Sequence, residues 1–130
     1  MTLKNAQYDI LIIDDSVTII DILSKILEFN GLSYKAVNSF NGAMGELKSK
    51  NKPKLIFLDV NMPDLNGYKF CKMLKSDDKY KDILIYYLTG ASQSELVNKF
   101  FETKADGYIT KPFNLNDFHD VFAFLKNQKN

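Results

Sequence analysis

The chain alternates between two hydrophobic patterns along its whole length, and this alternation constrains the fold more than any other feature. Short apolar runs rich in branched and aromatic residues have the composition of β-strands; they cover residues 8–13, 34–37, 55–58, 83–88 and 108–110. Several of these runs are apolar at successive positions instead of at every second one. Such continuous runs are typical of strands covered on both faces, as in a parallel sheet.

Segments with helical spacing separate the five runs. In the first segment, apolar residues recur at intervals of three and four, and Gly31 follows as a left-handed stop; they are Ile19, Ile20, Leu23, Ile26 and Leu27. Further helices are predicted through residues 43–47, after Gly67, from a capping box at 92–95, and from the N-cap residue Asn114. Since right-handed crossovers place helices on both faces of a parallel sheet, we predict an α/β fold with a doubly wound, five-stranded sheet and five helices.

Length and composition exclude several classes of protein. The 130 residues fit one domain, predicted to span 1–130 with no output domain. Seventeen basic residues, all of them lysine, against sixteen acidic residues give a net charge of +1, which argues against a nucleic-acid partner. One cysteine and one histidine rule out an intramolecular disulfide and a zinc site built from these residues. Without a signal core or a membrane-spanning apolar stretch, we expect a cytoplasmic protein with no membrane partner.

Polar residues follow the predicted strands at their carboxyl ends, where doubly wound sheets bind ligands. They are Asp14 and Asp15 after the first strand, Asp59 after the third, Thr89 after the fourth and Lys111 after the fifth. At about 5 Å and an effective dielectric constant near 20, each carboxylate pair repels by about 3 kcal/mol, or about 10 kcal/mol for three pairs. The three acids therefore need a cation or must take up protons.

An oxygen-only ligand set is typical of a hard divalent cation, and we predict a Mg²⁺ site. Mg²⁺ commonly bridges carboxylates to a phosphoryl group, whose remaining oxygens Lys111 and Thr89 would contact. A carboxylate is also a competent nucleophile towards phosphorus, and Asp59 stands alone on its strand end. The residues alone thus predict metal-assisted phosphoryl transfer onto an aspartate.

Four segments resemble the motifs of receiver domains of two-component response regulators. They are Ile-Ile-Asp-Asp-Ser at 12–16, Phe-Leu-Asp-Val-Asn-Met-Pro-Asp-Leu-Asn-Gly at 57–67, Leu-Thr-Gly-Ala at 88–91 and Tyr-Ile-Thr-Lys-Pro-Phe at 108–113. Their order and spacing agree with the predicted strand ends, and the resemblance covers nearly the whole chain. It implies a flavodoxin-like sheet with strand order 2-1-3-4-5.

The resemblance also implies roles for individual residues. Asp59 would accept a phosphoryl group from a phosphohistidine on a sensor histidine kinase or a histidine phosphotransfer protein. The implied Mg²⁺ ligands are Asp14, Asp15, Asp59 and the backbone carbonyl of Asn61, while Thr89 and Lys111 would bind the phosphoryl oxygens.

The resemblance further implies a conformational switch and a cis peptide bond. Thr89 would move towards the phosphoryl group and Tyr108 would turn inwards behind it. This would remodel the face made by the fourth helix, the fifth strand and the fifth helix, which would then control binding of a downstream protein. The bond between Lys111 and Pro112 matches the position of the family's cis peptide.

Other functions remain open at the level of sequence. The domain would act by binding, since no effector segment follows residue 130, or it would serve as a phosphorelay shuttle or a phosphate sink. A third alternative is that the chain is part of a longer protein. A phosphatase of the haloacid dehalogenase type needs a second aspartate two residues after its nucleophile, whereas Ser16 stands two residues after Asp14. A flavodoxin-like electron carrier would not place acids in its phosphate loop, and the pattern of a P-loop nucleotidase is missing from the sequence.

Overall fold

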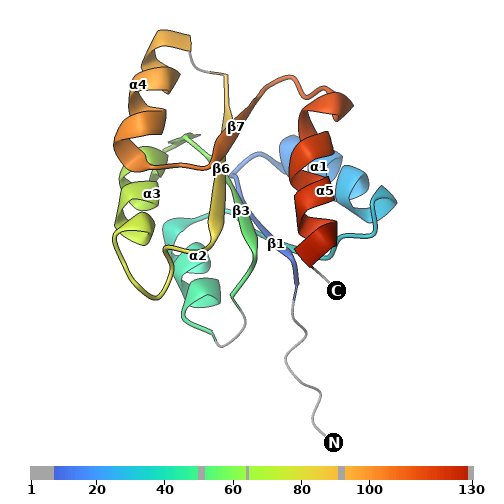
Figure 1. Ribbon diagram of the computed structural model, residues 1–130, viewed down its shortest axis with the longest axis horizontal. Helices are drawn as coiled ribbons and strands as arrows, with labels where there is room; N and C mark the ends of the chain where they lie inside the picture. The colour runs from blue at the N-terminus through green and yellow to red at the C-terminus, as the bar shows by residue number, and fades with distance from the viewer. Residues whose placement is uncertain (1–7, 50–51, 64, 91–92, 129–130) are drawn as a thin grey trace, which may run out of the picture.

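The computed structural model describes residues 8–49, 52–63, 65–90 and 93–128 (Figure 1). In these residues the chain forms β1 (Ile10–Ile13), α1 (Val17–Phe29), β2 (Tyr34–Val37), α2 (Phe40–Leu47), β3 (Leu55–Asp59), β4 (Asn61–Met62), β5 (Leu65–Asn66), α3 (Gly67–Lys75), β6 (Leu84–Thr89), α4 (Gln93–Thr103), β7 (Gly107–Thr110), the 3-10 helix η1 (Leu115–Phe118) and α5 (His119–Gln128). The capping box predicted at 92–95 includes Ser92, which lies outside the described residues.

The main sheet is parallel and five-stranded, with the order β2-β1-β3-β6-β7. Since these are the first to fifth long strands in the chain, both the predicted doubly wound α/β fold and the order 2-1-3-4-5 are confirmed. A second, antiparallel ribbon of β4 and β5 was not predicted from the sequence. It pairs Asn61 with Asn66 and brings the loop after β3 back to the start of α3.

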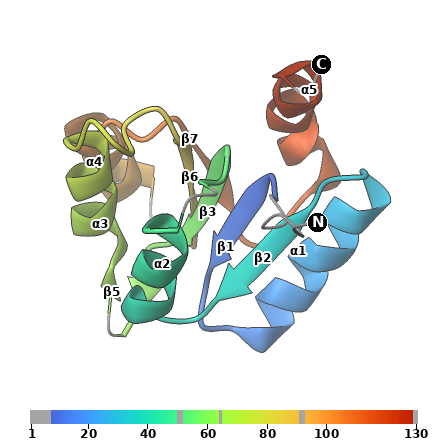
Figure 2. The same ribbon diagram turned by 90° about the horizontal axis from the view of Figure 1, so that it is seen from below.

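Helices cover both faces of the sheet, with α2, α3 and α4 on one side and α1 and α5 on the other (Figures 1 and 2). Successive residues of a strand point to opposite faces. Leu11 and Ile13 therefore pack in the core under α2, α3 and α4, whereas Ile10 and Ile12 pack under α1 and α5. All four are fully buried, which explains why the first apolar run does not alternate with polar residues.

The element ends differ slightly from the predicted ones. β3 and β6 extend one residue further than expected, so Asp59 and Thr89 are the last residues of their strands. The first strand begins at Ile10, two residues later than predicted, and the carboxylate of the preceding Asp9 accepts hydrogen bonds from Ser33. The predicted cap at Asn114 is present, but it starts η1, which leads into α5. Among the described residues, no helix is both long enough and apolar enough to cross a bilayer.

A glycine sets how closely α3 approaches the end of β3. A methyl group on Gly67 would lie 2.9 Å from the Val60 Cα and 3.0 Å from the Asp59 carbonyl oxygen. We expect Gly67→Ala to lower the free energy of unfolding by about 1–3 kcal/mol, because the added methyl group overpacks this contact. Urea denaturation measures the change.

Gly45 in α2 provides the matched control, because a methyl group there meets nothing within 4 Å. Gly45→Ala is expected to raise the free energy of unfolding by about 0.5–1 kcal/mol, since alanine restricts the unfolded chain and favours the helix. A Gly67→Ala protein as stable as the parent would show that the close approach of α3 is not needed.

Candidate functional site

The carboxyl ends of β1 and β3 bring three carboxylates together. Asp14 and Asp15 directly follow β1, and Asp59 ends β3. Each offers one oxygen, and these oxygens all lie within 4.8 Å of one another. Asp14 and Asp59 are buried, whereas Asp15 is exposed. The site is therefore an acidic pocket with two inner carboxylates and one at its mouth.

Backbone amides orient the two inner carboxylates. The Ser16 N–H donates to Asp14 Oδ1 at 2.9 Å, and the Asn61 N–H donates to Asp59 Oδ1 at 2.9 Å. Ser16 also caps α1, since its hydroxyl oxygen accepts from the Ile19 N–H. Sequence reasoning assigned no role to Ser16, although a serine just before an apolar helix is a recognisable N-cap signal.

Lys111 reaches the pocket from the end of β7. Its Nζ lies 3.4 Å from Asp14 Oδ2 and 3.5 Å from Asp59 Oδ1. The Lys111 N–H donates to the Thr89 carbonyl at 2.9 Å, and the bond from Lys111 to Pro112 is cis. One ammonium group thus faces the two inner carboxylates and offsets only part of the charge of the three acids.

Burial shifts the ionisation of the innermost carboxyl group. Removal from water raises the pKa of Asp14 to about 6, and the charge of Asp59 adds to this rise. The Ser16 N–H and the Lys111 ammonium act in the opposite direction without cancelling it. A divalent cation would favour the ionised form of Asp14, because its attraction to the carboxylate would compensate for the hydration that the carboxylate loses on burial.

The remaining predicted residues lie on the neighbouring strands. Thr89 is fully buried at the end of β6, the strand that pairs with β3. Asn61 stands on β4, two residues after Asp59, and its side chain is exposed. Tyr108 on β7 is 40% exposed and lies edge to face with Phe100 of α4, with ring centroids 6.0 Å apart. The acids, Lys111 and Asn61 therefore form one cluster, and Tyr108 faces away towards α4.

The three carboxylates fit Mg²⁺ by the chemistry of their donor atoms. Mg²⁺ prefers hard oxygen ligands in octahedral geometry and keeps several waters. Asp14, Asp15 and Asp59 supply carboxylate oxygens from two strand ends, and the exposed Asp15 leaves the mouth of the pocket open to water. The acidic cluster is therefore suited to hold this ion.

The affinity for Mg²⁺ is expected to fall by about tenfold between pH 7.5 and pH 5. Mg²⁺ binds the ionised carboxylate, and a pKa of about 6 leaves only about a tenth of Asp14 ionised at pH 5. Calorimetric titration in two buffers of different ionisation enthalpy measures both the affinity and the proton release, which we expect to be about half a proton per ion at pH 6. An affinity that is the same at both pH values would place Asp14 outside the metal site.

The fold and the site together define a doubly wound parallel sheet that carries three acids and a lysine at the carboxyl edge of its strands. The family model of the response regulator receiver domain matches residues 10–123, and the chain belongs to this family. Receiver domains work with histidine kinases, and phosphorylation and Mg²⁺ are general features of the family.

Curated relatives agree with this assignment. The chain is 36% identical over 109 residues to the DNA-binding dual master transcriptional regulator RpaA of Synechocystis. The matched region covers 83% of this chain and 44% of that protein. It is 35% identical to the phosphate regulon transcriptional regulatory protein PhoB of Klebsiella pneumoniae, over 80% of the chain and 45% of that protein. It is 36% identical to histidine kinase P4 of Formosa agariphila, over 84% of the chain but only 8% of that protein. The chain thus spans less than half the length of these relatives.

Solved structures show the same fold. A two-component response regulator from Legionella pneumophila superposes with a TM-score of 0.82 at 29% identity, covering 93% of this chain and 99% of that one. The receiver domain of a histidine kinase from Syntrophus aciditrophicus gives 0.81 at 33% identity, covering 94% and 92%. The chemotaxis response regulator CheY4 of Vibrio cholerae gives 0.79 at 26% identity, covering 92% and 99%.

Proposed function

We propose that Asp59 accepts a phosphoryl group from a phosphohistidine on a sensor histidine kinase or a histidine phosphotransfer protein, with Mg²⁺ bound beside it. The observation that carries this proposal is the cluster of three carboxylate oxygens within 4.8 Å of one another. The ammonium of Lys111 lies within 3.5 Å of two of these carboxylates. Such a pocket can receive a phosphoryl group only if its negative charge is offset.

The arrangement around Asp59 supports its role as nucleophile. The Asn61 N–H and Lys111 hold Oδ1, which orients the carboxylate and leaves its other oxygen to attack phosphorus. A P–O bond forms to Asp59, and the P–N bond breaks with its electron pair left on the imidazole nitrogen. Lys111 and Thr89 would bind the phosphoryl oxygens and stabilise the charge that develops on them. A Mg²⁺ held by Asp14, Asp15, Asp59 and the Asn61 carbonyl would neutralise charge on the incoming phosphoryl group.

We propose that the output surface is the face formed by α4, β7 and α5. Val97 and Phe101 of α4 expose apolar side chains there, and Tyr108 of β7 lies beside Phe100. Movement of Thr89 towards a phosphoryl group would free space into which Tyr108 turns. This rotation would remove an aromatic ring from the surface and change the fit for a downstream protein. The near balance of charge favours a protein target over nucleic acid.

The test is incubation of ¹⁵N-labelled protein with acetyl phosphate and Mg²⁺, followed by intact mass measurement and amide NMR spectra. We expect one phosphoryl group per chain, none after chelation of the metal, and shifted amide signals at Tyr108 and in α4. Absence of labelling would contradict the proposed acceptor. Labelling with unchanged signals around Tyr108 would remove the switch and leave the acceptor in place.

A further inference from the structure

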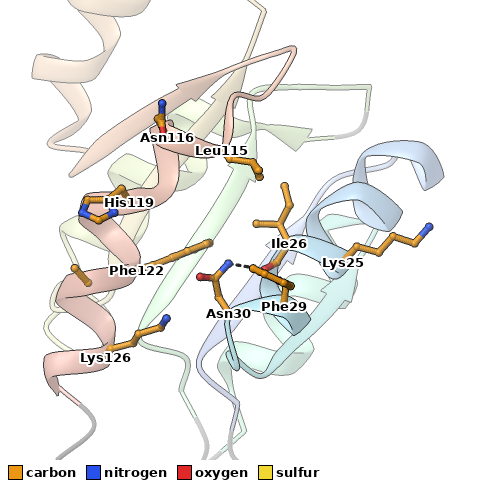
Figure 3. A pocket seen from close by; sticks show the side chains of 10 residues that line it. Lys25, Ile26, Phe29, Asn30, Leu115, Asn116, His119, Phe122 and Lys126 are labelled. Atoms are coloured by element: carbon orange, nitrogen blue, oxygen red, sulfur yellow. Dashed lines mark hydrogen bonds between the residues drawn. The ribbon is translucent and has the colours of Figure 1, made fainter.

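A pocket of about 590 Å³ lies between α1 and α5 (Figure 3). These two helices lie on the side of the sheet opposite α4 (Figure 1). It takes no part in the proposed phosphoryl transfer, because none of the three site aspartates and no part of Lys111 lines it. Its volume falls in the range of about 300–1,000 Å³ that is usual for sites of small molecules.

The walls of the pocket are mainly apolar. Ile26 and Phe29 of α1 face Leu115 of η1 and Phe122 of α5 across it (Figure 3). Phe122 is buried and belongs to the core, whereas Phe29 is 91% exposed and Leu115 is 70% exposed. An apolar ligand would bury much of the surface of these large apolar side chains, which is now exposed to water.

The polar groups of the pocket are positive or neutral. Its lining includes lysines, asparagines and one histidine but no acidic residue. The Lys126 amine extends from α5 towards Asn30, the residue that caps the end of α1 (Figure 3). Asn30 Nδ2 donates to the Ile26 carbonyl at 2.8 Å, so the Asn30 side chain is held at the wall.

Two lysines on the rim differ in their surroundings. Lys25 points away from the pocket (Figure 3). Its Nζ pairs with Asp21 Oδ2 at 3.2 Å. Lys126 pairs with no carboxylate among residues 8–49, 52–63, 65–90 and 93–128. The charge available to a ligand in the pocket is therefore that of Lys126.

We propose that this pocket binds a small apolar molecule that carries one anionic group, a carboxylate or a sulfonate. The anionic group contacts the Lys126 amine, and the apolar body packs against Phe29, Leu115 and Phe122. The charge complementarity selects an anion, and the apolar walls select a ligand with an aromatic or alkyl body.

A pair of fluorescent probes tests the proposal on the full chain at neutral pH. The probes are 1-anilinonaphthalene-8-sulfonate and its neutral parent N-phenyl-1-naphthylamine, which has the same rings without the sulfonate. We expect saturable binding of the sulfonate probe and shifted amide signals in α1, η1 and α5. Binding without saturation, or shifts confined to α4 and β7, would overturn the proposal.

Matched variants separate the site from general charge attraction. Lys126→Gln should weaken binding of the sulfonate probe by about tenfold and that of the neutral probe by less than about twofold, since a charge-assisted contact is lost. Lys25→Gln removes the same charge and should change neither affinity by more than about twofold. Phe29→Ser should weaken both probes. Equal effects of the two lysine variants would overturn the proposal.

Sedimentation distinguishes the ligand from a second copy of the chain as the occupant. We expect a monomer mass that does not change with protein concentration. A mass that rises to that of a dimer in the parent, and stays that of a monomer in Phe29→Ser, would assign the pocket to self-association and overturn the proposal. All three variants alter exposed side chains, and their urea midpoints check that the fold is retained.

Discussion

An Asp59→Asn variant is expected to take up no phosphoryl group from acetyl phosphate and Mg²⁺ under conditions that label the parent fully. The amide has almost the same shape as the carboxylate, so the buried end of β3 keeps its packing. It lacks the negative oxygen that attacks phosphorus, and it removes one ligand from the acidic cluster. Intact mass measurement detects the loss, which should exceed about a hundredfold in labelling rate.

The control for this variant is Asp78→Asn, which changes a carboxylate whose side chain is 95% exposed on the loop after α3. It should be labelled like the parent, which shows that loss of an acidic group elsewhere has no effect. The Asp59→Asn protein should also be at least as stable as the parent without metal, because one member of a repelling cluster is gone. Normal labelling of Asp59→Asn would show that another residue is the nucleophile.

Most of the sheet and most of the acidic cluster were predictable, for the same physical reason. Strands buried on both faces must be apolar throughout, so their ends are visible as the first charged residues after each run. In a parallel sheet these ends meet at one edge, which is why Asp14, Asp59 and Lys111, far apart in the chain, were expected to lie together. The structure places the Lys111 Nζ within 3.5 Å of both carboxylates.

Features that depend on approach between distant segments were not predictable. The β4–β5 ribbon has two residues on each side, too few for a hydrophobic pattern. The contact that requires Gly67 depends on how α3 meets the end of β3. The direction of the Lys126 amine depends on the packing of α5 beside α1, which stand about a hundred residues apart. Composition and spacing carry no information about such distances.

The second large effect concerns Lys111, the cation that faces the two inner carboxylates. At pH 7.5 and without metal, Lys111→Met is expected to lower the free energy of unfolding by about 2–4 kcal/mol. Removing one partner of a buried charge pair leaves the remaining charges uncompensated. The side chain of Lys111 is 25% exposed and those of Asp14 and Asp59 at most 5%, so water screens the loss only in part. Chemical denaturation measures the difference.

Mg²⁺ and pH should each reverse much of this loss, which separates a charge effect from lost packing of the lysine stem. At a free concentration of a hundred times the dissociation constant, Mg²⁺ stabilises a protein by about 2.7 kcal/mol. The variant should bind Mg²⁺ more tightly than the parent, because no lysine competes for the carboxylates. At pH 5, Asp14 with its raised pKa of about 6 is mostly neutral, so the deficit should shrink. A double variant Lys111→Met with Asp14→Asn should recover stability for the same reason. A deficit that is unchanged by metal, by acid and by the second substitution would mean that Lys111 stabilises the fold through its aliphatic stem alone.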